Sequence, residues 1–509
     1  MWRASLRAFL FAVVAAGSVV PARGQPAADS TERAFTLRIR PPSGLPGLVP
    51  VFRAKADKPS LRLSAGLRVL ASSQAGGPIS FLVDLRDQLD FPRAAAALAR
   101  ASASRRARRI WVTRALGAIA LRSQGRLRPL LDGLKQKGEV ESWTAVSVVN
   151  RLLVKARPAA VLELARHREV ASLTEEIESV AALQDEPAGP LPDAGEGEGE
   201  ASSSWPLEAI GVGQAWLAGI DGSGVTVGLI DSGASDQHEQ LRGNFRGGPR
   251  SWFDPLSGSA APADVRVGHG TAVLSCAVGQ AQQTALCGVA PGAKWIAAIG
   301  LNAGRYNNVL LTQASDWMLN VGQPDVLIAA WRLPGQRCDG SLRPIVNAWR
   351  AAGMIVVFAA GNGGPAEASD VSPANYTDVF PGAEAVLSVG AVDAEKRVDP
   401  HSSRGPNGCA ASSPYPQLVA PGADVLVALP AAASLYRAAS GTSFAAGYVA
   451  GAAALLLQRC PHAQVEQVEQ ALRRGAIDLG PPGPDPTYGH GLLNVPRALR
   501  ALEKQQACR

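Results

Sequence analysis

From residue 205 onward, short runs of apolar residues alternate with longer stretches whose apolar residues recur at helical spacing. The short runs end in Gly, Asp or Pro, as strands do where the chain turns. The strands expected are residues 225–230, 294–299, 326–330, 355–360, 385–389 and 418–419. The helices expected between them are residues 271–278, 309–321, 344–352 and 442–458. Apolar strands separated by helices predict an α/β fold, with a parallel sheet covered on both faces.

The preceding part of the chain has a different pattern. Residues 28–75 contain many Pro and Arg residues and only short strand-like runs, whereas residues 78–176 predict a small α+β unit. In that unit we expect strands over 78–85 and 171–173, a β-branched segment over 140–155, and helices over 107–137 (broken near Gly125) and 158–166. Strands and helices that alternate in this way predict a sheet with helices on one face.

The start of the chain is typical of a secretory signal. Arg3 and Arg7 precede an apolar stretch over 8–20 that is too short to span a membrane comfortably. Residues 185–204 combine Gly, Glu, Pro and Ser, which predicts a flexible acidic linker. The expected organisation is therefore a signal over 1–27, an N-terminal unit over 28–184, the linker over 185–204 and a larger domain over 205–509.

No other segment predicts a membrane span, and no internal repeat is evident. The apolar stretch over 445–457 is interrupted by Gly447, Tyr448 and Gly451, so a buried helix explains it better.

The net charge of +7 hides an asymmetry. Residues 1–185 hold 29 Lys and Arg against 15 Asp and Glu (net +14), and the remaining residues hold 21 against 28 (net −7). Opposite charges favour binding of the two halves to each other. For the most basic cluster, Arg105-Arg106-Ala107-Arg108-Arg109, we expect a solvated helix face rather than a contact between the halves. Nucleic-acid binding is not expected, because no stacking aromatics or known reader motif accompany the cluster.

All the cysteines lie in the acidic half. They are Cys276, Cys287, Cys338, Cys409, Cys460 and Cys508. An even number in an exported chain favours disulfides, and six cysteines allow 15 connectivities. We expect Cys276 to pair with Cys287, which closes a short loop. The basic half contains no cysteine, so no disulfide ties it to the rest.

Three polar residues stand where site residues form in open α/β sheets, at strand ends or helix starts. Asp231 ends an apolar strand, and Asn362 follows another one within Gly361-Asn362-Gly363. His269 stands between two glycines in front of an apolar helix. An imidazole there can face a carboxylate on one nitrogen and a hydroxyl on the other, and an amide can stabilise an oxyanion. Taken singly, Asp and Asn at such positions are often turn residues. The other histidines (His167, His238, His401, His462 and His490) are assigned no chemistry.

A serine completes the set. Ser443 lies in Gly441-Thr442-Ser443-Phe444-Ala445-Ala446, at the start of an apolar helix. A serine there is often only an N-cap. A hydroxyl becomes a nucleophile when a base takes its proton and a carboxylate fixes the tautomer of that base. Asp231, His269 and Ser443 supply these parts, and Asn362 with the Ser443 N–H supplies the oxyanion donors.

Residues 205–502 resemble the catalytic domain of subtilisin-like serine proteases. The motifs that carry the resemblance are Gly228-Leu229-Ile230-Asp231-Ser232-Gly233, Gly268-His269-Gly270-Thr271, Gly288-Val289-Ala290-Pro291-Gly292-Ala293, Ala359-Ala360-Gly361-Asn362, Ser402-Ser403-Arg404-Gly405-Pro406, Val419-Ala420-Pro421-Gly422, Gly441-Thr442-Ser443-Phe444-Ala445-Ala446 and Tyr488-Gly489-His490-Gly491. The resemblance implies that Asp231 orients His269, that His269 is general base and then acid, and that Ser443 attacks. It also implies that Asn362 and the Ser443 N–H hold the oxyanion.

The resemblance further implies a secreted endopeptidase made as a zymogen. The N-terminal unit then corresponds to a propeptide that assists folding, inhibits the enzyme and is removed at or near the linker. Expected partners are protein or peptide substrates and the chain's own propeptide, without nucleic acid or a membrane span, in a monomer. No cofactor is required for the chemistry. The family frequently binds structural calcium, for which the sequence allows no ligand assignment.

Departures from the family concern the substrate groove. Where the family usually has Ser-Leu-Gly or Ser-Trp-Gly, this chain has Ala329-Ala330-Trp331-Arg332-Leu333. Ala330, Trp331, Arg332 and Gly361 are the groove candidates, and Trp331 and Arg332 are expected to narrow or re-route the substrate edge. Gly447-Tyr448 replaces the usual Pro-His after the serine, and Glu239 stands where proline is common.

Two other functions compete with the protease. One is a catalytically silent binding protein that kept the triad residues but lost its groove. The other is a serine esterase, which is disfavoured because Gly-x-Ser-x-Gly is absent around Ser443 and the order Asp–His–Ser differs from that class.

Overall fold

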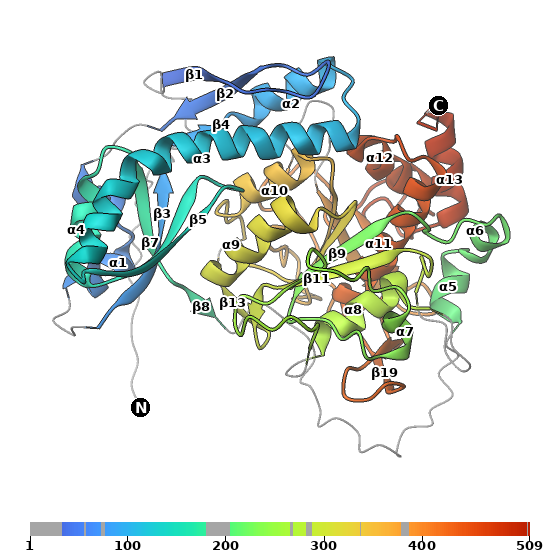
Figure 1. Ribbon diagram of the computed structural model, residues 1–509. Coiled ribbons are helices and arrows are strands. Elements are labelled where there is room, and N and C mark those ends of the chain that lie inside the picture. Colours follow the sequence, from blue (N-terminus) through green and yellow to red (C-terminus); the bar gives the residue numbers. More distant parts are fainter. Residues whose placement is uncertain are drawn as a thin grey trace, which may run out of the picture.

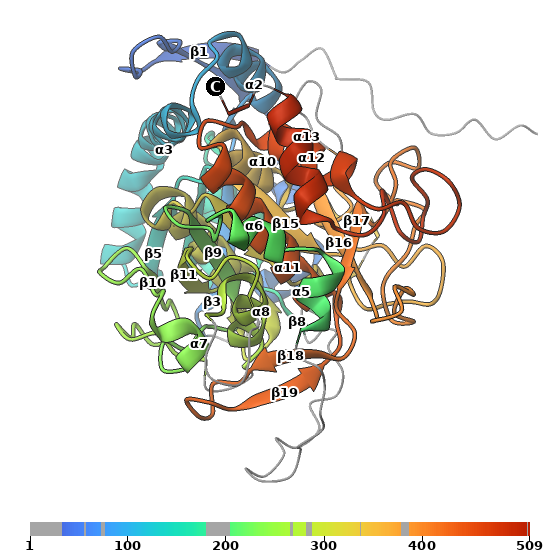
Figure 2. The ribbon, with the colours of Figure 1, turned by 90° about the vertical axis from the view of Figure 1, so that its right-hand side faces the viewer.

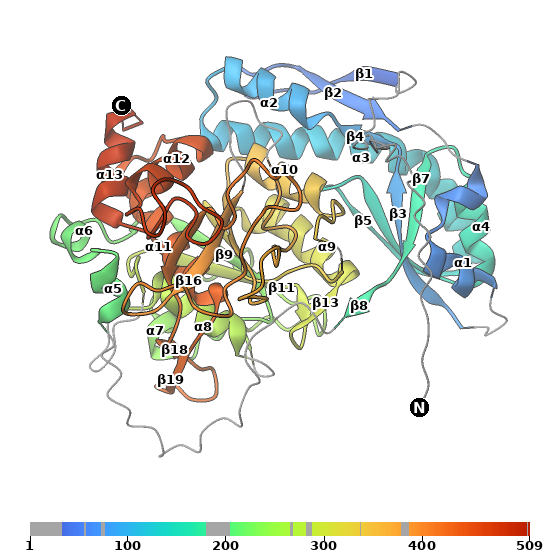
Figure 3. The ribbon, with the colours of Figure 1, turned by 180° about the vertical axis from the view of Figure 1, so that it is seen from behind.

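The structure is a computed structural model. It describes residues 33–54, 58–72, 77–179, 204–264, 268–280, 288–335, 337–377, 386–505 and 507–508. Residues 33–179 form an N-terminal unit that lies against one side of a larger C-terminal unit, residues 204–508 (Figures 1 and 3). The expected signal and nearly all of the expected linker lie outside the described residues, so the boundaries proposed for them stay predictions.

The C-terminal unit is built on a seven-stranded sheet. All its strand pairs are parallel, in the order β10-β11-β9-β14-β15-β16-β17. The strands are β9 (Thr226–Asp231), β10 (Trp252–Phe253), β11 (Lys294–Ile299), β14 (Val326–Ala329), β15 (Ile355–Ala359), β16 (Leu387–Val392) and β17 (Leu418–Pro421). The predicted α/β fold class is confirmed, and the six predicted strands are present. The two-residue edge strand β10 was not predicted.

Helices cover both faces of this sheet. On one face lie α8 (His269–Val278) and α11 (Thr442–Arg459), and on the other lie α9 (Asn308–Trp317) and α10 (Arg343–Ala351). Successive residues of β9 point to opposite faces, so Leu229 packs in the first core and Ile230 in the second. Because both faces are buried, each strand is apolar throughout rather than alternating.

Smaller elements complete the C-terminal unit. They are α5 (Trp205–Ala209), α6 (Gly213–Leu217), α7 (Glu239–Arg242), β12 (Leu301–Asn302), β13 (Arg305–Asn307), the π-helix Met318–Gly322 that continues α9, β18 (Val425–Ala428), β19 (Tyr436–Ala439), α12 (Val465–Gly475) and α13 (Val495–Lys504). Figure 2 shows α12 and α13 side by side at the end of the chain.

The N-terminal unit contains a four-stranded antiparallel sheet, in the order β5-β6-β3-β7. Its strands are β3 (Ile79–Leu85), β5 (Val140–Val146), β6 (Arg151–Ala156) and β7 (Val170–Glu175). The sheet packs against α1 (Ala65–Ser72), α4 (Pro158–Arg166) and the second half of α3 (Arg105–Gln136). These elements have a core of their own, which includes Phe81, Leu131 and Leu164.

Helix α3 corrects one prediction. The expected break near Gly125 is absent, and the helix runs through Gly125 and Pro129 without interruption. A glycine costs a helix about 1 kcal/mol. Buried leucines on either side, such as Leu116 and Leu131, offset that cost by packing against neighbouring elements.

A second part of the N-terminal unit, which we call the arm, has no separate core. The arm consists of β1 (Arg33–Arg38), β2 (Leu48–Arg53), β4 (Asp87–Leu89), α2 (Phe91–Arg100) and residues 105–119 of α3. Its buried side chains, such as Trp111, belong to the same cluster as Trp349 and Phe358 of the C-terminal unit. Sequence patterning missed both α1 and α2.

Two disulfides are described, Cys338–Cys409 and Cys460–Cys508, and both lie within the C-terminal unit. The predicted pairing of Cys276 with Cys287 stays a prediction, because Cys287 lies outside the described residues. Cys276 is buried in α8, and its carbonyl accepts a hydrogen bond from the Val289 N–H at 3.2 Å. The chain thus returns beside Cys276 two residues after Cys287. Among the described helices, none combines the length and hydropathy needed to cross a bilayer.

Candidate active site

Asp231 and His269 form a buried hydrogen-bonded pair. Asp231 ends β9 and is completely buried, and His269 begins α8. The Nδ1 atom of His269 lies 2.7 Å from Oδ1 of Asp231. Because an ionised carboxylate only accepts hydrogen bonds, Nδ1 carries the hydrogen and Nε2 is the basic nitrogen of the neutral ring. The pair therefore fixes the tautomer that a general base requires.

A second carboxylate, which sequence reasoning missed, fixes the backbone around this pair. Asp264 is buried and accepts hydrogen bonds from the Ser232 hydroxyl (2.9 Å), the Gly268 N–H (3.1 Å), and the N–H and hydroxyl of Thr271 (both 2.9 Å). It thus ties the end of β9 to the first turn of α8. Burial raises the pKa of Asp264, and the charge of Asp231 adds to this, whereas the hydrogen bonds from Thr271 and Ser232 oppose it. No local motif marks Asp264 in the sequence.

Ser443 is the second residue of α11 and is 3% exposed. Its hydroxyl donates to the carbonyl of Ala330 at 3.4 Å, directly after the end of β14. The ring of the next residue, Phe444, lies 6.4 Å from the ring of His269, measured between centroids. Ser443 therefore lies at the same edge of the sheet as Asp231, and the residue after it has its ring near that of the histidine.

Two glycines bring α8 and α11 together. A Cβ atom at Gly447 would lie 2.7 Å from the carbonyl oxygen of Val273, and one at Gly451 would lie 2.6 Å from that of Ala277. Only glycine allows the two backbones to approach this closely. Because His269 and Ser443 stand in the first turns of the two helices, this crossing sets their relative position. Gly447, a departure from the family pattern, thus has a clear packing role.

Asn362 is tied to the residue before the serine. Its Oδ1 accepts from the N–H (3.0 Å) and the hydroxyl (2.8 Å) of Thr442, and the Gly361 N–H donates to the same hydroxyl at 3.0 Å. With Oδ1 turned toward Thr442, the Nδ2 donors lie on the other side of the Cβ–Cγ bond and point away from Thr442. The structure therefore gathers Asp231, His269, Asn362 and Ser443 at one edge of the sheet.

Comparison with known proteins assigns the chain to a family. The model of the subtilase family of peptidases matches residues 222–491, which is more than half of the chain and includes all four residues. The chain belongs to the subtilase family. Subtilases are serine-type peptidases, so the protein is a hydrolase of that class.

Several relatives agree with this assignment. Bacillopeptidase F of Bacillus subtilis (strain 168) is 29% identical over 467 residues, 83% of this chain but 31% of that protein. This subtilase thus spans about a third of that relative. Subtilisin DY of Bacillus licheniformis is 32% identical over 287 residues, 55% of this chain and 93% of that protein. Subtilisin BL of Lederbergia lenta is 33% identical over 304 residues, 59% of this chain and 99% of that protein.

The groove candidates of this subtilase separate into two sets. Ala330 and Gly361 adjoin Ser443 and Asn362, as described above. Trp331 does not face a substrate edge, because its indole is buried in the core beneath α9 and α10 and its N–H donates to the carbonyl of Ile230 at 2.8 Å. The strand alternation that turns Ala330 to one face turns Trp331 to the other, so the expectation that its side chain narrows the groove is wrong. Arg332 is half-buried, and burial lowers its pKa.

Other polar residues of the subtilase have structural contacts. His238 caps α7, with Nδ1 accepting from the Gln240 N–H at 3.2 Å and Nε2 donating to the Leu435 carbonyl at 3.0 Å. Glu239 accepts from the Tyr436 hydroxyl at 2.6 Å. In the part of the chain that the structure describes, no group of three or more His, Cys, Asp or Glu side chains is arranged to hold a metal ion.

Proposed function

We propose that this subtilase is a secreted serine endopeptidase made as an inactive precursor. The observation that carries the proposal is the 2.7 Å hydrogen bond between Asp231 and His269, buried beside the first turn of α11 where Ser443 stands. Buried Asp–His pairs next to a serine hydroxyl are the arrangement that activates serine for acyl transfer.

The chemistry assigned to these residues is peptide-bond hydrolysis through an acyl-enzyme. Ser443 Oγ attacks the scissile carbonyl carbon while its proton passes to Nε2 of His269. The negative charge of Asp231 stabilises the imidazolium that His269 becomes. The oxyanion accepts hydrogen bonds from Asn362 and from the N–H of Ser443 at the helix N-terminus. His269 then protonates the leaving amine. Water next attacks the acyl carbon while a proton passes from it to His269, and His269 returns that proton to Ser443 Oγ as the carboxylic acid product is released.

The maturation part of the proposal is supported by the last strand of the N-terminal unit. Residues of β8 (Glu178–Ser179) pair antiparallel with β13, Ser179 opposite Tyr306 and Glu178 opposite Asn307. An ion pair of 2.9 Å joins Arg305 to Glu178. A segment that adds a strand to an enzyme edge binds in the manner of an extended peptide. We infer that residues 28–184 act as a propeptide and that the cut lies between Ser179 and Trp205.

The test compares the intact precursor with two variants. Ser443→Ala removes the nucleophile, and Ser440→Ala is a matched control three residues earlier, whose hydroxyl contacts Asp424 instead. Wild type and Ser440→Ala should shorten to the mature form and react with a fluorophosphonate probe, whereas Ser443→Ala should do neither. If all three chains stay uncut and unlabelled, the subtilase is a catalytically silent binding protein and the proposal fails.

A further inference from the structure

The basic cluster at the start of α3 is inserted into the C-terminal unit. Arg105 and Arg109 lie largely buried, and only Arg106 of the four arginines is exposed. The expectation of a solvated helix face is therefore wrong for Arg105, Arg108 and Arg109. Burial lowers the pKa of Arg105 and of Arg109, and the neighbouring Asp325 counteracts this.

These arginines meet a matching set of acceptors. Arg105 donates to the Asp325 carboxylate and to the Pro461 carbonyl, both at 3.2 Å. Arg109 donates to the carbonyls of Gln323 (2.6 Å) and Pro324 (2.7 Å). Arg108 lies 3.5 Å from the carboxylate of Glu466 in the first turn of α12. We call this set of contacts the arginine anchor.

The backbones at the arginine anchor are also closely fitted. Gly353 follows α10 with φ +84°, and a Cβ atom there would lie 2.9 Å from Cβ of Arg105 and 3.0 Å from its Cα. Beside these polar contacts, the buried side chains of α2 and α3 share one core with α10. The arm therefore meets the C-terminal unit over a continuous apolar surface that ends in three arginines.

The arginine anchor lies at the opposite edge of the sheet from the active site. Asp325 directly precedes β14, and its Oδ2 accepts from the N–H of Thr226, the first residue of β9. Asp231 is the last residue of the same six-residue strand. At about 3.3 Å per residue the two edges are roughly 17 Å apart. Figure 1 shows the start of α3 near α12, away from β8 and β13.

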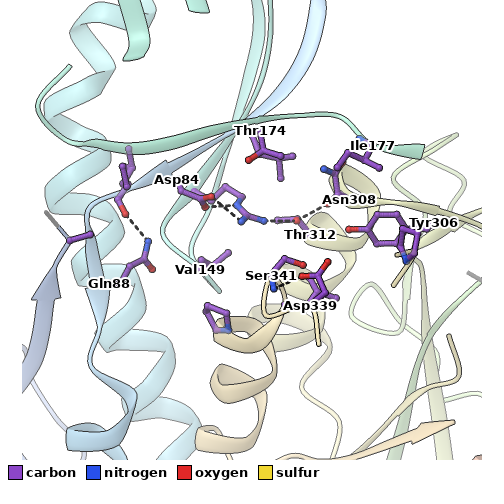
Figure 4. A pocket seen from close by; sticks show the side chains of 18 residues that line it. Asp84, Gln88, Val149, Thr174, Ile177, Tyr306, Asn308, Thr312, Asp339 and Ser341 are labelled. Carbon is purple, nitrogen blue, oxygen red and sulfur yellow. Dashed lines mark hydrogen bonds and ion pairs between the residues drawn. The ribbon is translucent and has the colours of Figure 1, made fainter. Parts of the chain in front are cut away.

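The contact nearer the active site is less closely packed. Between the N-terminal sheet and α9 there is a cavity of about 420 Å³, lined from both units by apolar residues and by polar ones such as Asp84, Thr174, Asn308, Thr312 and Asp339 (Figure 4). A cavity weakens an interface, because the atoms that line it lose packing partners.

We propose that the arm is a second attachment site, which keeps the N-terminal unit on the C-terminal unit after the connecting segment has been cut. The inference rests on the proposed function, because it assumes that maturation cuts the chain between the units. Release of the inhibiting unit, and with it the onset of activity, then depends on breaking the arginine anchor rather than on the cut alone.

The experiment separates release from catalysis. In the full chain with Ser443→Ala, a recognition site for an added sequence-specific protease is placed within residues 186–203. After the cut, gel filtration over time measures how fast the N-terminal unit leaves. The test variant is Arg105→Gln with Arg109→Gln, and the matched control is Arg128→Gln, an arginine of the same helix whose side chain is 68% exposed.

The expected result is that the uncharged double variant loses its N-terminal unit roughly 30-fold faster or more, because removing one partner of a buried charge pair mainly raises the dissociation rate. The control should match the parent chain. Equal dissociation of the double variant and the parent would overturn the proposal. In the catalytically active chain, the double variant should cut itself at the normal rate but show a shorter lag before activity.

A variant on the other side of the contact keeps the test decisive if the double variant does not fold. Glu466→Gln leaves the arm intact and removes the partner of Arg108, so it should give a smaller acceleration in the same direction. No acceleration there, with a folded chain, counts against the arginine anchor. Failure of the active chain to cut itself contradicts the proposed function instead, while the added protease still measures the attachment.

Discussion

On one face of the central sheet, α8 and α11 pack directly on the strands and carry His269 and Ser443 in their first turns. On the other face, α9 and α10 are themselves covered by the N-terminal unit, and their core continues into the arm. The first face supplies the catalytic side chains, and the second carries the shared apolar core between the units, while Glu466 of α12 adds an ion pair to Arg108 from the first face. One sheet thus separates chemistry from attachment, and a substitution on either face should affect one of these and spare the other.

The comparison predicts its largest effect for two aspartates on opposite faces of the sheet, Asp231 and Asp316. Asp231→Asn should lower kcat by about 10⁴-fold, because the amide cannot hold the required tautomer of His269. Asp316 of α9 accepts instead from the N–H groups of Ser147 (2.7 Å) and Val148 (2.8 Å) of the N-terminal unit. Asp316→Asn should leave kcat of the mature enzyme unchanged and loosen the attachment. Steady-state kinetics on both variants measures this, and a comparable loss of kcat in each would break the comparison.

The next largest predicted effect comes from replacing one of two helical glycines, Gly447 in α11 or Gly133 in α3, by alanine. Gly447→Ala places a methyl group 2.7 Å from the Val273 carbonyl, which should cost about 1–3 kcal/mol of stability and about 10²-fold in kcat as the two helix starts move apart. Gly133→Ala in α3 meets no atom within 4 Å and should stabilise the precursor by about 1 kcal/mol. Urea unfolding and kcat report both. Unchanged stability and kcat in Gly447→Ala would show that the crossing of α8 and α11 does not position the site.

A third prediction concerns the two ends of α3. After the N-terminal unit is cut off and separated, backbone amides of residues 91–119 should exchange with solvent rapidly, because their core belongs to the C-terminal unit. Amides of β3 and β6 should stay protected by the unit's own core. Hydrogen exchange followed by mass spectrometry distinguishes these segments. Equal protection along the whole of α3 would mean that the arm is stable by itself.

The smallest predicted effect is a pH dependence of the free energy of unfolding, caused by His238 on the active-site face. Burial lowers the pKa of His238 from its ordinary value of 6.5, so below about 6.5 the unfolded chain binds a proton that the folded chain does not. Its contribution to the free energy of unfolding is complete above that value and declines as the pH falls. Urea titrations of the mature enzyme should show this slope, and His238→Gln should reduce it.

Much of the fold was predictable because strands buried on both faces leave long apolar runs, and because Asp231, His269, Asn362 and Ser443 stand at strand ends and helix starts. Asp264 was not predictable, since it acts through hydrogen bonds from residues up to 32 positions away. The face of the sheet to which the Trp331 side chain points depends on strand register, which amino-acid composition does not reveal. The environment of Arg105 and Arg109 was not predictable, because both residues find their hydrogen-bond acceptors more than 200 residues later in the chain.

The shared core of the arm has a consequence for the order of assembly. One face of the four-stranded sheet of the N-terminal unit packs on helices of the same unit, whereas Leu82 and Leu153 on the other face pack against Val309 of α9. The strand pairs lie within about a hundred residues of chain, so the sheet can form early. The start of α3 gains its partners only when the strands and α10 of the C-terminal unit are in place. Ordering of the first turns of this helix therefore reports that the sheet behind the active site is complete.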